Sequence, residues 1–556
     1  MSLILKTTVR LRGKTLARQL DAAAETPAAA QQAFLRRILN QNAATAFGRE
    51  HQFSHLQREQ DYRNAVPIAD YEAFRPYINR LLAGEKAVLT AASPFMFALT
   101  SGTTSKPKYI PVTRQSEELG SRIMRQWLYR ALLDHPRYLD CATVGIVSPA
   151  IEGKTAMGIP YGSVSGRIYQ QIPAIVRRSY AVPYPVFELE NYDERYWAIA
   201  RFALARQISF LSTANPSTLS RLAEIVAAQP EAFIRAIHDG TLGLPGTPAR
   251  PFSLQPFLKP QPQRARELTR IVNRTHTLYP KDYWPQLQLI GCWTGGSVGS
   301  QIQKLQRYFG SLPIRDLGYL ASEARMTLPY QDHTAAGILA LNTNYYEFVP
   351  EAAADAADPP LFSSHELEAG RRYSIVLTTA AGLYRYRIND IVEVAGFYKN
   401  APLLTFVRKG QDMTNLTGEK MHVNHVLQAV EQVQQQFQLA IVQYRMIANA
   451  TANRYDFYLE LQQSPPRTQI QQQLLTALDR ALAAVNLEYK QKRQSKRLQP
   501  LRLHLMHPGW SEAAVRKAIH NGQRDAQYKW KVLCQQVKAV DQQSVAIALE
   551  GADEAG

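Results

Sequence analysis

Apolar residues recur three and four positions apart along much of the first part of the chain. The first 20 residues form a basic stretch with this spacing, and residues 29–50 carry Ala, Phe, Leu and Ile in the same pattern before ending in FGRE. The spacing predicts two amphipathic helices, the second of which closes on the glycine of FGRE. The segment QPFLKPQPQRARE holds three prolines and is typical of a loop or surface crossing.

From residue 284 onward, short apolar runs bounded by turn residues replace the helical pattern. LQLIGCW is typical of a buried strand, TGGSVG of a glycine-rich turn and IQKLQRYF of a helix, and then LPIRDLGYL, GILAL, YYEFVP, YSIVLTT and IVEVAGF predict successive strands. After about residue 408, the helical HVNHVLQAVEQVQQQF and TQIQQQLLTALDRALAAV flank the strand-like LAIVQYRMIA and YDFYLELQ. These changes predict a large α/β domain over residues 1–408 and a small α+β domain over residues 409–556.

Composition adds a charge bias to this picture. The 556 residues are 46% apolar and 20% charged, which is typical of a folded globular protein with two or more domains. Lys and Arg number 64 against 46 Asp and Glu, so the net charge is +18. This excess favours anionic partners, either nucleic acid or small molecules that carry phosphate or carboxylate groups, although a basic solvated surface explains it equally well.

The cysteines and the hydropathy bear on the cellular compartment. Cys141, Cys292 and Cys534 are far apart and lack C-x-x-C spacing, which argues against a disulfide framework and a zinc site and fits a reducing cytoplasm. The acid-free start resembles a transit peptide in composition, but the apolar run Leu3–Leu5 is too short for a secretory signal. No run of 18 apolar residues occurs, so we expect no integral membrane association.

The richest candidate chemistry lies at residues 97–113, which read FALTSGTTSKPKYIPVT. A turn made of small hydroxyl residues and glycine presents backbone N–H groups and hydroxyls to phosphate oxygens, and the lysines add positive charge. The segment is not a P-loop, because Lys106 and Pro107 follow Gly102 without the second glycine of G-x-x-x-x-G-K-[ST]. The sequence therefore predicts a polyphosphate site of another kind, with a plain solvent loop as the alternative.

Two later stretches complete a set of three motifs. TSGTTSKPK resembles the phosphate loop of adenylate-forming enzymes, GYLASE at 318–323 resembles their second motif, and AGLYRYRINDIVEVAGF at 381–397 resembles their third. Further landmarks follow in the same order, among them VPIADYEAFRPYINRLLAGE, YYEFVP, LTGEKM and DAQYKWKVL. With these, the chain resembles the Gretchen Hagen auxin-responsive family of acyl-acid–amido synthetases over about residues 30–535.

The resemblance implies a fold and a domain arrangement. We expect a large N-terminal adenylate-forming domain with mixed β-sheets and a β-barrel-like part, which binds ATP and the acyl substrate. We also expect a small C-terminal α+β domain that pivots about residues 408–420 between two half-reactions. Two departures from the family pattern stand out. Ser105 and Lys106 occupy positions where relatives often have glycine, and Asn389 replaces the usual glycine in RINDI. Asn tolerates a positive φ better than most residues, so the turn can survive.

The resemblance also implies ATP and Mg²⁺ as cofactors and assigns residues to them. The ATP-binding residues of the phosphate loop would be Ser101, Gly102, Thr103, Thr104, Ser105 and Lys108, with Lys106 in place of Lys108 if the loop is shorter. Tyr319 would stack on adenine, Ser322 would contact the α-phosphate, and Glu323 would hold Mg²⁺. Asp390 would bind both ribose hydroxyls, and Arg408 would follow at the start of the hinge.

Three further positions complete the predicted site. Lys529 in AQYKW falls where the family places the lysine that reaches the site during adenylation, so it is the candidate catalytic residue. Gly295 and Gly296 in WTGGSVG, and Tyr345 and Tyr346 in NYYEFVP, are candidates for the substrate pocket. The alternatives are a solvated basic face for the lysine, a simple strand-to-helix turn for the glycines and core packing for the tyrosines.

The implied activity is ATP-dependent adenylation of a carboxylic acid, followed by amide formation with an amino acid or another amine. Two alternatives stay open: an adenylating ligase with a thiol acceptor such as coenzyme A, and a non-catalytic binder of nucleotide or nucleic acid. The basic run KQKRQSKR at 490–497 has no recognised nucleic-acid module around it, so we expect no nucleic-acid partner. The identities of the acid and the amine, and the oligomeric state, stay open.

Overall fold

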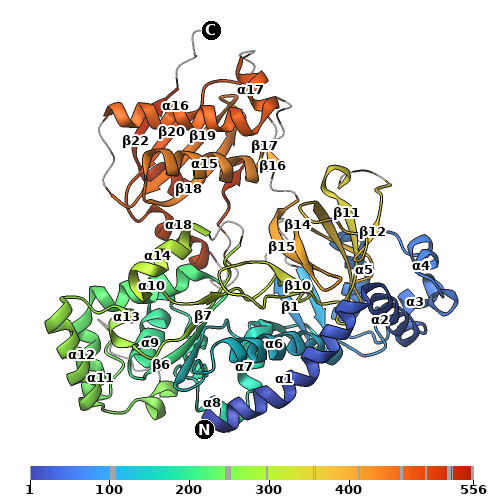
Figure 1. Cartoon of the computed structure of the whole chain (residues 1–556), viewed down its shortest axis with the longest axis horizontal. Coiled ribbons are helices and arrows are strands. Elements are labelled where there is room, and N and C mark those ends of the chain that lie inside the picture. Colours follow the sequence, from blue (N-terminus) through green and yellow to red (C-terminus); the bar gives the residue numbers. More distant parts are fainter. Residues whose placement is uncertain are drawn as a thin grey trace. The chain divides into compact units, whose positions relative to one another are not determined.

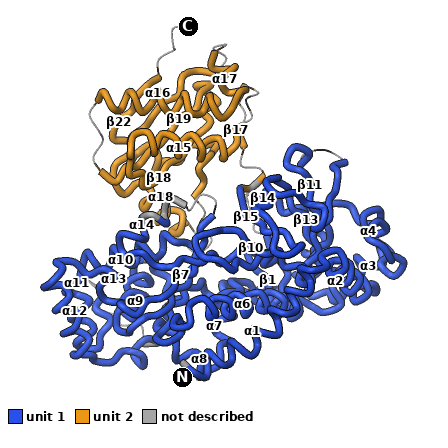
Figure 2. Tube along the Cα trace, viewed as in Figure 1, with its two compact units in different colours: residues 1–298, 302–407 blue, residues 299–301, 408–556 orange. Residues whose placement is uncertain are grey.

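The computed structural model describes residues 2–100, 108–244, 252–295, 299–354, 356, 358–410, 413–414, 416–417, 419, 421–463, 468–494, 498–521, 528 and 530–551. The chain forms two compact units (Figure 2). Unit 1 contains residues 1–298 and 302–407, and unit 2 contains residues 299–301 and 408–556.

Unit 1 begins with a series of helices, drawn in blue in Figure 1: α1 (Ser2–Glu25), α2 (Pro27–Asn42), α3 (Ala46–Glu50), α4 (Glu59–Ala65) and α5 (Tyr71–Leu82). The first predicted helix is confirmed, but the single helix expected over residues 29–50 is wrong. The helix ends at Asn42, and Gly48 lies inside the separate helix α3. A Cβ at Gly48 would lie 2.1 Å from the carbonyl oxygen of Asn42. The glycine therefore permits a close backbone approach and does not end a long helix.

A four-stranded parallel sheet forms the second part of unit 1. Its order is β3-β6-β7-β8, and its strands are β3 (Ala142–Gly145), β6 (Ile208–Ser212), β7 (Leu289–Gly291) and β8 (Ile314–Arg315). The strands are buried, and side chains from the neighbouring helices complete one hydrophobic core with them. In a parallel sheet, the segments that follow the carboxyl ends of the strands meet at one edge. The glycine turn after β7 and the GYLASE segment after β8 meet in this way.

Helices connect and surround these strands. They are α6 (Arg114–Asp134), α7 (Val164–Gln171), α8 (Ala174–Arg177), α9 (Tyr192–Leu204), α10 (Pro216–Ala228), α11 (Pro230–Asp239), α12 (Pro262–Thr275), α13 (Pro280–Tyr283) and α14 (Gly299–Phe309). The proline-rich QPFLKPQPQRARE is only partly a loop, because α12 starts at its last proline. Proline is favoured in the first turn of a helix, where its missing N–H costs no hydrogen bond.

The remaining strands of unit 1 form two further sheets. A four-stranded sheet has the order β2-β1-β5-β4, with β1 (Met96–Thr100), β2 (Lys108–Val112), β4 (Gly153–Lys154) and β5 (Pro160–Gly162). A seven-stranded sheet has the order β12-β11-β13-β14-β15-β10-β9, with β9 (Thr327–Leu328), β10 (Gly337–Leu339), β11 (Tyr345–Pro350), β12 (Phe362–Ser363), β13 (Arg372–Thr378), β14 (Tyr386–Tyr398) and β15 (Ala401–Lys409). Its inner face packs against the N-terminal helices in the largest hydrophobic core.

Unit 2 is built around a five-stranded sheet of order β21-β18-β19-β20-β22. Its strands are β18 (Ile441–Asn449), β19 (Arg454–Leu461), β20 (Arg502–Met506), β21 (Leu533–Cys534) and β22 (Val545–Glu550), and the short pair β16 (Met413–Thr414) and β17 (Met421–His422) precedes them. Its helices are α15 (Val423–Phe437), α16 (Thr468–Val485), α17 (Leu487–Gln494), α18 (Trp510–His520) and α19 (Ala539–Gln543). The predicted mixed α/β class is confirmed. In the part of the chain that the structure describes, no helix is long and apolar enough to cross a bilayer.

Candidate active site

Tyr319 lies at the centre of the predicted site, just beyond the carboxyl end of β8. The preceding Gly318 has φ +89°, and a Cβ there would lie 2.5 Å from the carbonyl oxygen of Thr327. Only glycine fits this position, and its backbone leads directly to Tyr319. The N–H of Tyr319 donates to Oγ1 of Thr327 at 2.8 Å, and its ring lies 5.5 Å from the ring of Phe406 in β15. These contacts fix both the backbone and the ring of Tyr319.

The hydroxyl of Tyr319 donates to Oδ2 of Asp390 at 2.6 Å. This hydrogen bond joins residues of the second and third motifs that are 71 positions apart. Asp390 is only 2% exposed. Burial, together with the negative charge of Asp390, raises the pKa of Tyr319 well above its ordinary value, so the phenol stays a hydrogen-bond donor.

Asp390 is aimed by an irregularity in β14. Ser374 pairs with Ile391 and Val376 pairs with Arg387, so three residues of β14 face one residue of β13 between these pairs. Asn389, the middle of the site's RINDI segment, has φ +59°. The left-handed conformation expected of Asn389 is confirmed, and the extra residues bend the strand as a β-bulge does. The bulge turns Asp390 toward Tyr319.

Ser322 and Glu323 occupy the tip of a tight turn. Leu320 and Arg325 pair across this turn, and the N–H of Ala321 donates to the carbonyl oxygen of Ala324 at 2.8 Å. Both tip residues are half-buried. The hydroxyl of Tyr386, the first residue of β14, donates to Oε1 of Glu323 at 3.3 Å. Burial and the charge of Glu323 raise the pKa of Tyr386, so this phenol also stays protonated.

The glycine turn after β7 is tied to the same segment by Asp316. Oδ2 of Asp316 accepts from the N–H and the hydroxyl of Thr294 at 2.6 and 2.8 Å, and Oδ1 accepts from the N–H of Gly318 at 2.6 Å. Burial raises the pKa of Asp316, and these hydrogen bonds oppose the rise. Gly295 follows, and a Cβ there would lie 2.8 Å from Cβ of Ala335. The start of this turn, at Gly295, is therefore tightly packed.

Lys108 begins β2 and pairs with Thr100 at the end of β1, so both ends of the predicted phosphate loop are fixed. Its ammonium lies 5.3 Å from the centre of the Tyr71 ring. The hydroxyl of Tyr71 accepts from the N–H of Tyr109 at 2.7 Å, which ties the start of α5 to β2. Tyr71, Glu323 and Asp390 all act electrostatically on the Tyr386 hydroxyl, so α5, β2, the GYLASE turn and β14 converge on one region.

The remaining predicted residues have other contacts or lie outside the described residues; of them, Tyr346 also acts electrostatically on Tyr319. Tyr345 and Tyr346 are fully buried; the hydroxyl of Tyr345 donates to Glu59, and that of Tyr346 accepts from Nδ2 of Asn344 at 3.1 Å. Their contacts fit the core-packing alternative, and a role in the substrate pocket stays a prediction. Arg408, in unit 2, is 6% exposed and donates to the carbonyl oxygen of Gly410 at 3.2 Å. Outside the described residues lie Ser101, Gly102, Thr103, Thr104, Ser105, Gly296 and Lys529.

The structure adds two residues that the sequence did not single out. Phe406 packs against Tyr319, and Tyr386 donates to Glu323. Tyr386 belongs to the third motif, AGLYRYRINDIVEVAGF, and Phe406 lies two positions before Arg408, but strand register decides which side chains of these stretches reach the site. Among the described residues, no cluster of three or more His, Cys, Asp or Glu side chains is arranged to hold a metal ion. A single carboxylate at Glu323 still fits Mg²⁺, which usually binds one or two carboxylates together with phosphates and water.

Comparison with known sequences decides the family. The sequence matches the GH3 family N-terminal domain over residues 16–314, the GH3 family central domain over residues 337–409 and the GH3 family C-terminal domain over residues 424–538. The chain belongs to the GH3 family. The resemblance to the Gretchen Hagen (GH3) family, drawn from the three motifs, is thereby confirmed.

Known GH3 proteins cover nearly the whole chain at low identity. The indole-3-acetic acid-amido synthetase GH3.3 of Arabidopsis thaliana is 24% identical over 534 residues, which make up 90% of this chain and 88% of that protein. The jasmonoyl–L-amino acid synthetase JAR6 of Nicotiana attenuata is 24% identical over 525 residues, 90% of each chain. A solved structure of the AtGH3.15 acyl acid amido synthetase in complex with 2,4-DB superposes with a TM-score of 0.85 at 20% identity, over 97% of each chain. This GH3 chain therefore has the fold of that synthetase.

Proposed function

We propose that this GH3 family member is an ATP-dependent acyl acid–amido synthetase. The observation that carries the proposal is the hydrogen bond from Tyr319 to Asp390, with Glu323 and Tyr386 beside it. It unites the second and third motifs in one site of unit 1, within a chain that belongs to a family containing amido synthetases. The same nucleotide site would serve an adenylating ligase with a thiol acceptor, so the similarity to amido synthetases is what favours an amine acceptor.

The reaction has two steps. In the first, a carboxylate oxygen of the acid attacks the α-phosphorus of ATP, the bond from that phosphorus to the bridging oxygen breaks, and pyrophosphate leaves. In the second, the amine nitrogen attacks the acyl carbon, the bond from that carbon to the phosphate oxygen breaks, AMP leaves, and the nitrogen releases one proton. Negative charge develops on oxygen in both steps, so fixed cations and hydrogen-bond donors are what the site must supply.

The described residues suit the binding of nucleotide. Asp390 would accept hydrogen bonds from the ribose hydroxyls, while the phenol of Tyr319 holds its carboxylate in place. The aromatic ring of Tyr319 would lie against adenine, with Phe406 supporting it from behind. Lys108, at the start of β2, would place one positive charge beside the phosphate loop. Mg²⁺ would be held by Glu323 and would neutralise phosphate charge when bound.

Unit 2 would contribute Lys529 and would change its position between the steps, as the sequence resemblance implies. We place the protein in the cytoplasm, because the three widely spaced cysteines fit a reducing compartment. The substrates would be a small carboxylic acid and an amino acid or other amine.

A release assay tests the proposal. Pyrophosphate release from ATP is measured across a panel of aryl, indole and aliphatic carboxylic acids, with all common amino acids present, and products are identified by mass spectrometry. We expect release that depends on one class of acid and an amide product that contains one class of amine. Acid-dependent release that yields a coenzyme A thioester, and no amide, would identify the thiol-acceptor ligase instead. No acid-dependent release with any acid would overturn the proposal.

A further inference from the structure

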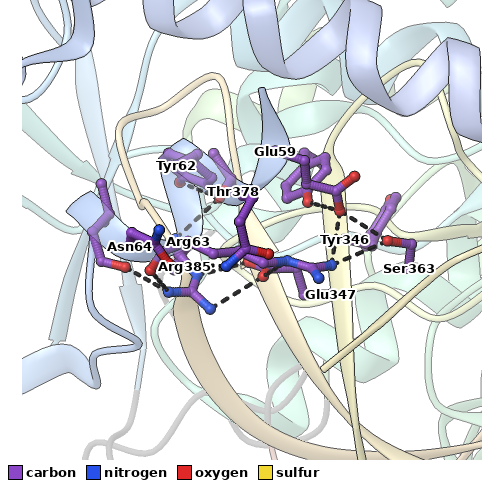
Figure 3. A network of polar contacts seen from close by, with 12 residues as sticks. Glu59, Tyr62, Arg63, Asn64, Tyr346, Glu347, Ser363, Thr378 and Arg385 are labelled. Carbon is purple, nitrogen blue, oxygen red and sulfur yellow. Dashed lines mark hydrogen bonds and ion pairs between the residues drawn. The ribbon is translucent and has the colours of Figure 1, made fainter. Parts of the chain in front are cut away.

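A partly buried network of four alternating charges lies in unit 1 (Figure 3). Arg385 donates through Nε and Nη2 to the two carboxylate oxygens of Glu347, at 2.9 and 3.1 Å. Nε of Arg63 donates to Oε1 of Glu347 at 3.1 Å, and Nη2 of Arg63 donates to Oε1 of Glu59 at 2.8 Å. The side chains of Arg385 and Glu347 are 4% and 1% exposed. Two arginines and two glutamates therefore balance each other, with the buried Arg385–Glu347 pair linked to the partly exposed Arg63 and Glu59.

The third guanidinium nitrogen of Arg385, Nη1, binds a neighbouring segment of the chain. Its Nη1 donates to the carbonyl oxygens of Arg63 and Val66, at 2.8 and 2.6 Å. These two carbonyls belong to the last turn of α4 and the residue after it. All three guanidinium nitrogens are thus engaged, and a planar fork of this kind has no equivalent in any other side chain.

The backbone of Arg385 is as closely held as its side chain. Its φ is +46°, a left-handed conformation that is rare for a residue with a long side chain. Its N–H donates to Oγ1 of Thr378 at 3.0 Å, and that hydroxyl is bonded to the Tyr62 hydroxyl at 2.7 Å. Its carbonyl oxygen accepts from the N–H of Ala69 at 3.1 Å. The surrounding contacts keep the chain in this unfavourable conformation.

The consequence falls on the next residue, Tyr386. The N–H of Arg387 donates to the carbonyl oxygen of Ala69 at 2.8 Å, so Ala69 forms a parallel bridge with Tyr386 and is bonded to the residues on both sides of it. The ring of Tyr386 packs against Phe74 of α5 with centroids 6.0 Å apart. Its hydroxyl can then reach Glu323, the candidate magnesium ligand. Arg385 belongs to the charge network, and the next residue along the chain, Tyr386, contacts Glu323 directly.

We propose that Arg385 is a positioning residue of this enzyme, which acts through Tyr386 to set the orientation of the Glu323 carboxylate. The inference rests on the proposed function. Within the described part of the chain, the hydrogen bonds of Arg385 reach no residue predicted to contact ATP; they fix the left-handed turn and the segment 66–69, and these fix Tyr386. Loss of its fork loosens Tyr386, and the carboxylate that accepts from Tyr386 becomes a weaker ligand for a metal.

The main test compares Arg385→Lys with Arg201→Lys. Lysine keeps the charge but loses the fork. Arg201 is a matched control in unit 1: it is 1% exposed and, within the described part of the chain, donates only to the carbonyl oxygens of Thr241 and Ala236, at 3.0 and 2.9 Å, within a different hydrophobic core. The Mg²⁺ concentration for half-maximal acid-dependent pyrophosphate release should rise about tenfold in Arg385→Lys, the lower end of the range for loss of a partner behind a metal ligand. It should stay at the wild-type value in Arg201→Lys.

A double-mutant cycle asks whether Arg385 acts through Tyr386. Tyr386→Phe removes the hydroxyl that donates to Glu323, so we expect about a tenfold increase in the half-saturating Mg²⁺ concentration. The double variant Arg385→Lys/Tyr386→Phe should be no worse than Tyr386→Phe alone, because both changes disable the same contact. Multiplied effects would contradict a path through Tyr386.

Hydrogen–deuterium exchange without substrate provides a readout that does not depend on activity. Peptides that cover residues 66–75 and 384–390 should exchange at least about fivefold faster in Arg385→Lys than in wild type, while peptides of α9 and α10 stay unchanged. Glu347→Gln, which is isosteric, should show the same pattern and replaces Arg385→Lys if that variant does not fold. Unchanged exchange in both peptides would overturn the inference. If wild-type protein releases no pyrophosphate, the proposed function fails, while exchange still decides whether Arg385 positions Tyr386.

Discussion

Among the described residues, each unit has an arginine–carboxylate pair with both side chains buried, and the two pairs differ in what surrounds them. Arg385 and Glu347 in unit 1 form a two-pronged pair with a second arginine, Arg63, on the same carboxylate. In unit 2, Nη1 of Arg445 donates to Oδ1 of Asp541 at 2.6 Å, and these side chains are 2% and 0% exposed. Both arginines also donate to backbone carbonyls, Arg385 to Val66 and Arg445 to Lys531. Burial and charge alone therefore do not distinguish them.

Their neighbours do distinguish them. Arg385 has a left-handed backbone and is followed by Tyr386, which reaches Glu323. Arg445 lies in the regular strand β18, and its guanidinium is 4.2 Å from the centre of the Trp530 ring, while the indole N–H of Trp510 donates to the same Asp541 oxygen at 3.0 Å. The network of Arg385 stabilises a left-handed turn next to Tyr386, and that of Arg445 packs against and bonds to the indole rings in the core of unit 2. A buried ion pair is thus informative about function only through the residues that its geometry holds.

The first prediction, with the largest expected effect, concerns the loss of the buried Arg445–Asp541 pair in unit 2. Arg445→Ala leaves Asp541 buried without its cation, and removal of one partner from a buried pair costs about 3–5 kcal/mol of folding free energy. Hydrogen exchange measured along a urea titration should show that the amides of β18 and β19 lose protection from exchange, while those of β13 and β14 in unit 1 are unaffected. The half-saturating Mg²⁺ concentration of the folded protein should be unchanged, in contrast to Arg385→Lys.

An apolar double replacement is the control for this prediction. Arg445→Met with Asp541→Leu removes both charges and should recover much of the lost stability, because no unpaired charge stays buried. An Arg445→Ala variant as stable as wild type would show that the pair contributes nothing beyond the tryptophan packing.

A second prediction concerns what unit 2 contributes beyond its own core. Lys529 lies outside the described residues, and we propose that its ammonium stabilises charge that develops on oxygen in adenylation. Loss of one aimed donor typically costs about 10²–10³ in rate, so Lys529→Ala should slow adenylation by that factor. Amide formation from a chemically supplied acyl adenylate should be nearly unaffected. The measurement is a pair of single-turnover rates, and equal losses in both would argue against a role confined to one position of unit 2.

The third prediction separates two residues of unit 1 that touch each other. Asp390→Ala removes the carboxylate that we propose accepts from two ribose hydroxyls; charge-assisted hydrogen bonds are worth about 1.5–3 kcal/mol each, so the KM for ATP should rise tenfold or more. Tyr319→Phe keeps the aromatic ring and removes only the phenol that donates to Asp390, so its effect on this KM should be clearly smaller. An unchanged KM in a folded Asp390→Ala protein would exclude the ribose assignment.

The sequence predicted local structure better than contacts. Strands β11, β13 and β14 fall on YYEFVP, YSIVLTT and IVEVAGF, because the apolar pattern that indicates a strand is contained within a few neighbouring residues. The sequence did not predict that Glu59 would bond to Tyr345, 286 positions away, because sheet order and strand register set such contacts. Motif order suggested Tyr319 and Asp390, whereas Tyr386 and Phe406 required the register of β14 and β15. The pocket assignment of Tyr345 and Tyr346 shows a further limit, since core and pocket share the same apolar pattern.

The prediction with the smallest expected effect concerns a titrating group in the core of unit 2, His504. His504 in β20 is 8% exposed and stacks on Tyr458 with ring centroids 4.4 Å apart, and within the described residues neither ring nitrogen has a hydrogen-bond partner. Burial lowers the pKa of His504 to about 4; the carboxylate of Asp456 opposes this, and Arg502 and Arg454 reinforce it.

The sign of the pH dependence follows from this depressed pKa. The unfolded chain, with a histidine pKa near 6.5, binds a proton that the folded chain does not, so stability is complete above about pH 6.5 and falls as the pH drops from there toward about 4. Between pH 7 and 5.5, the free energy of unfolding should fall by about 1 kcal/mol through this group. His504→Phe keeps the stack on Tyr458 and should remove that part of the slope in urea titrations, whereas His520→Gln, at an exposed position of α18, should titrate like wild type. Identical slopes in His504→Phe and wild type would show that His504 is already solvated in the folded protein.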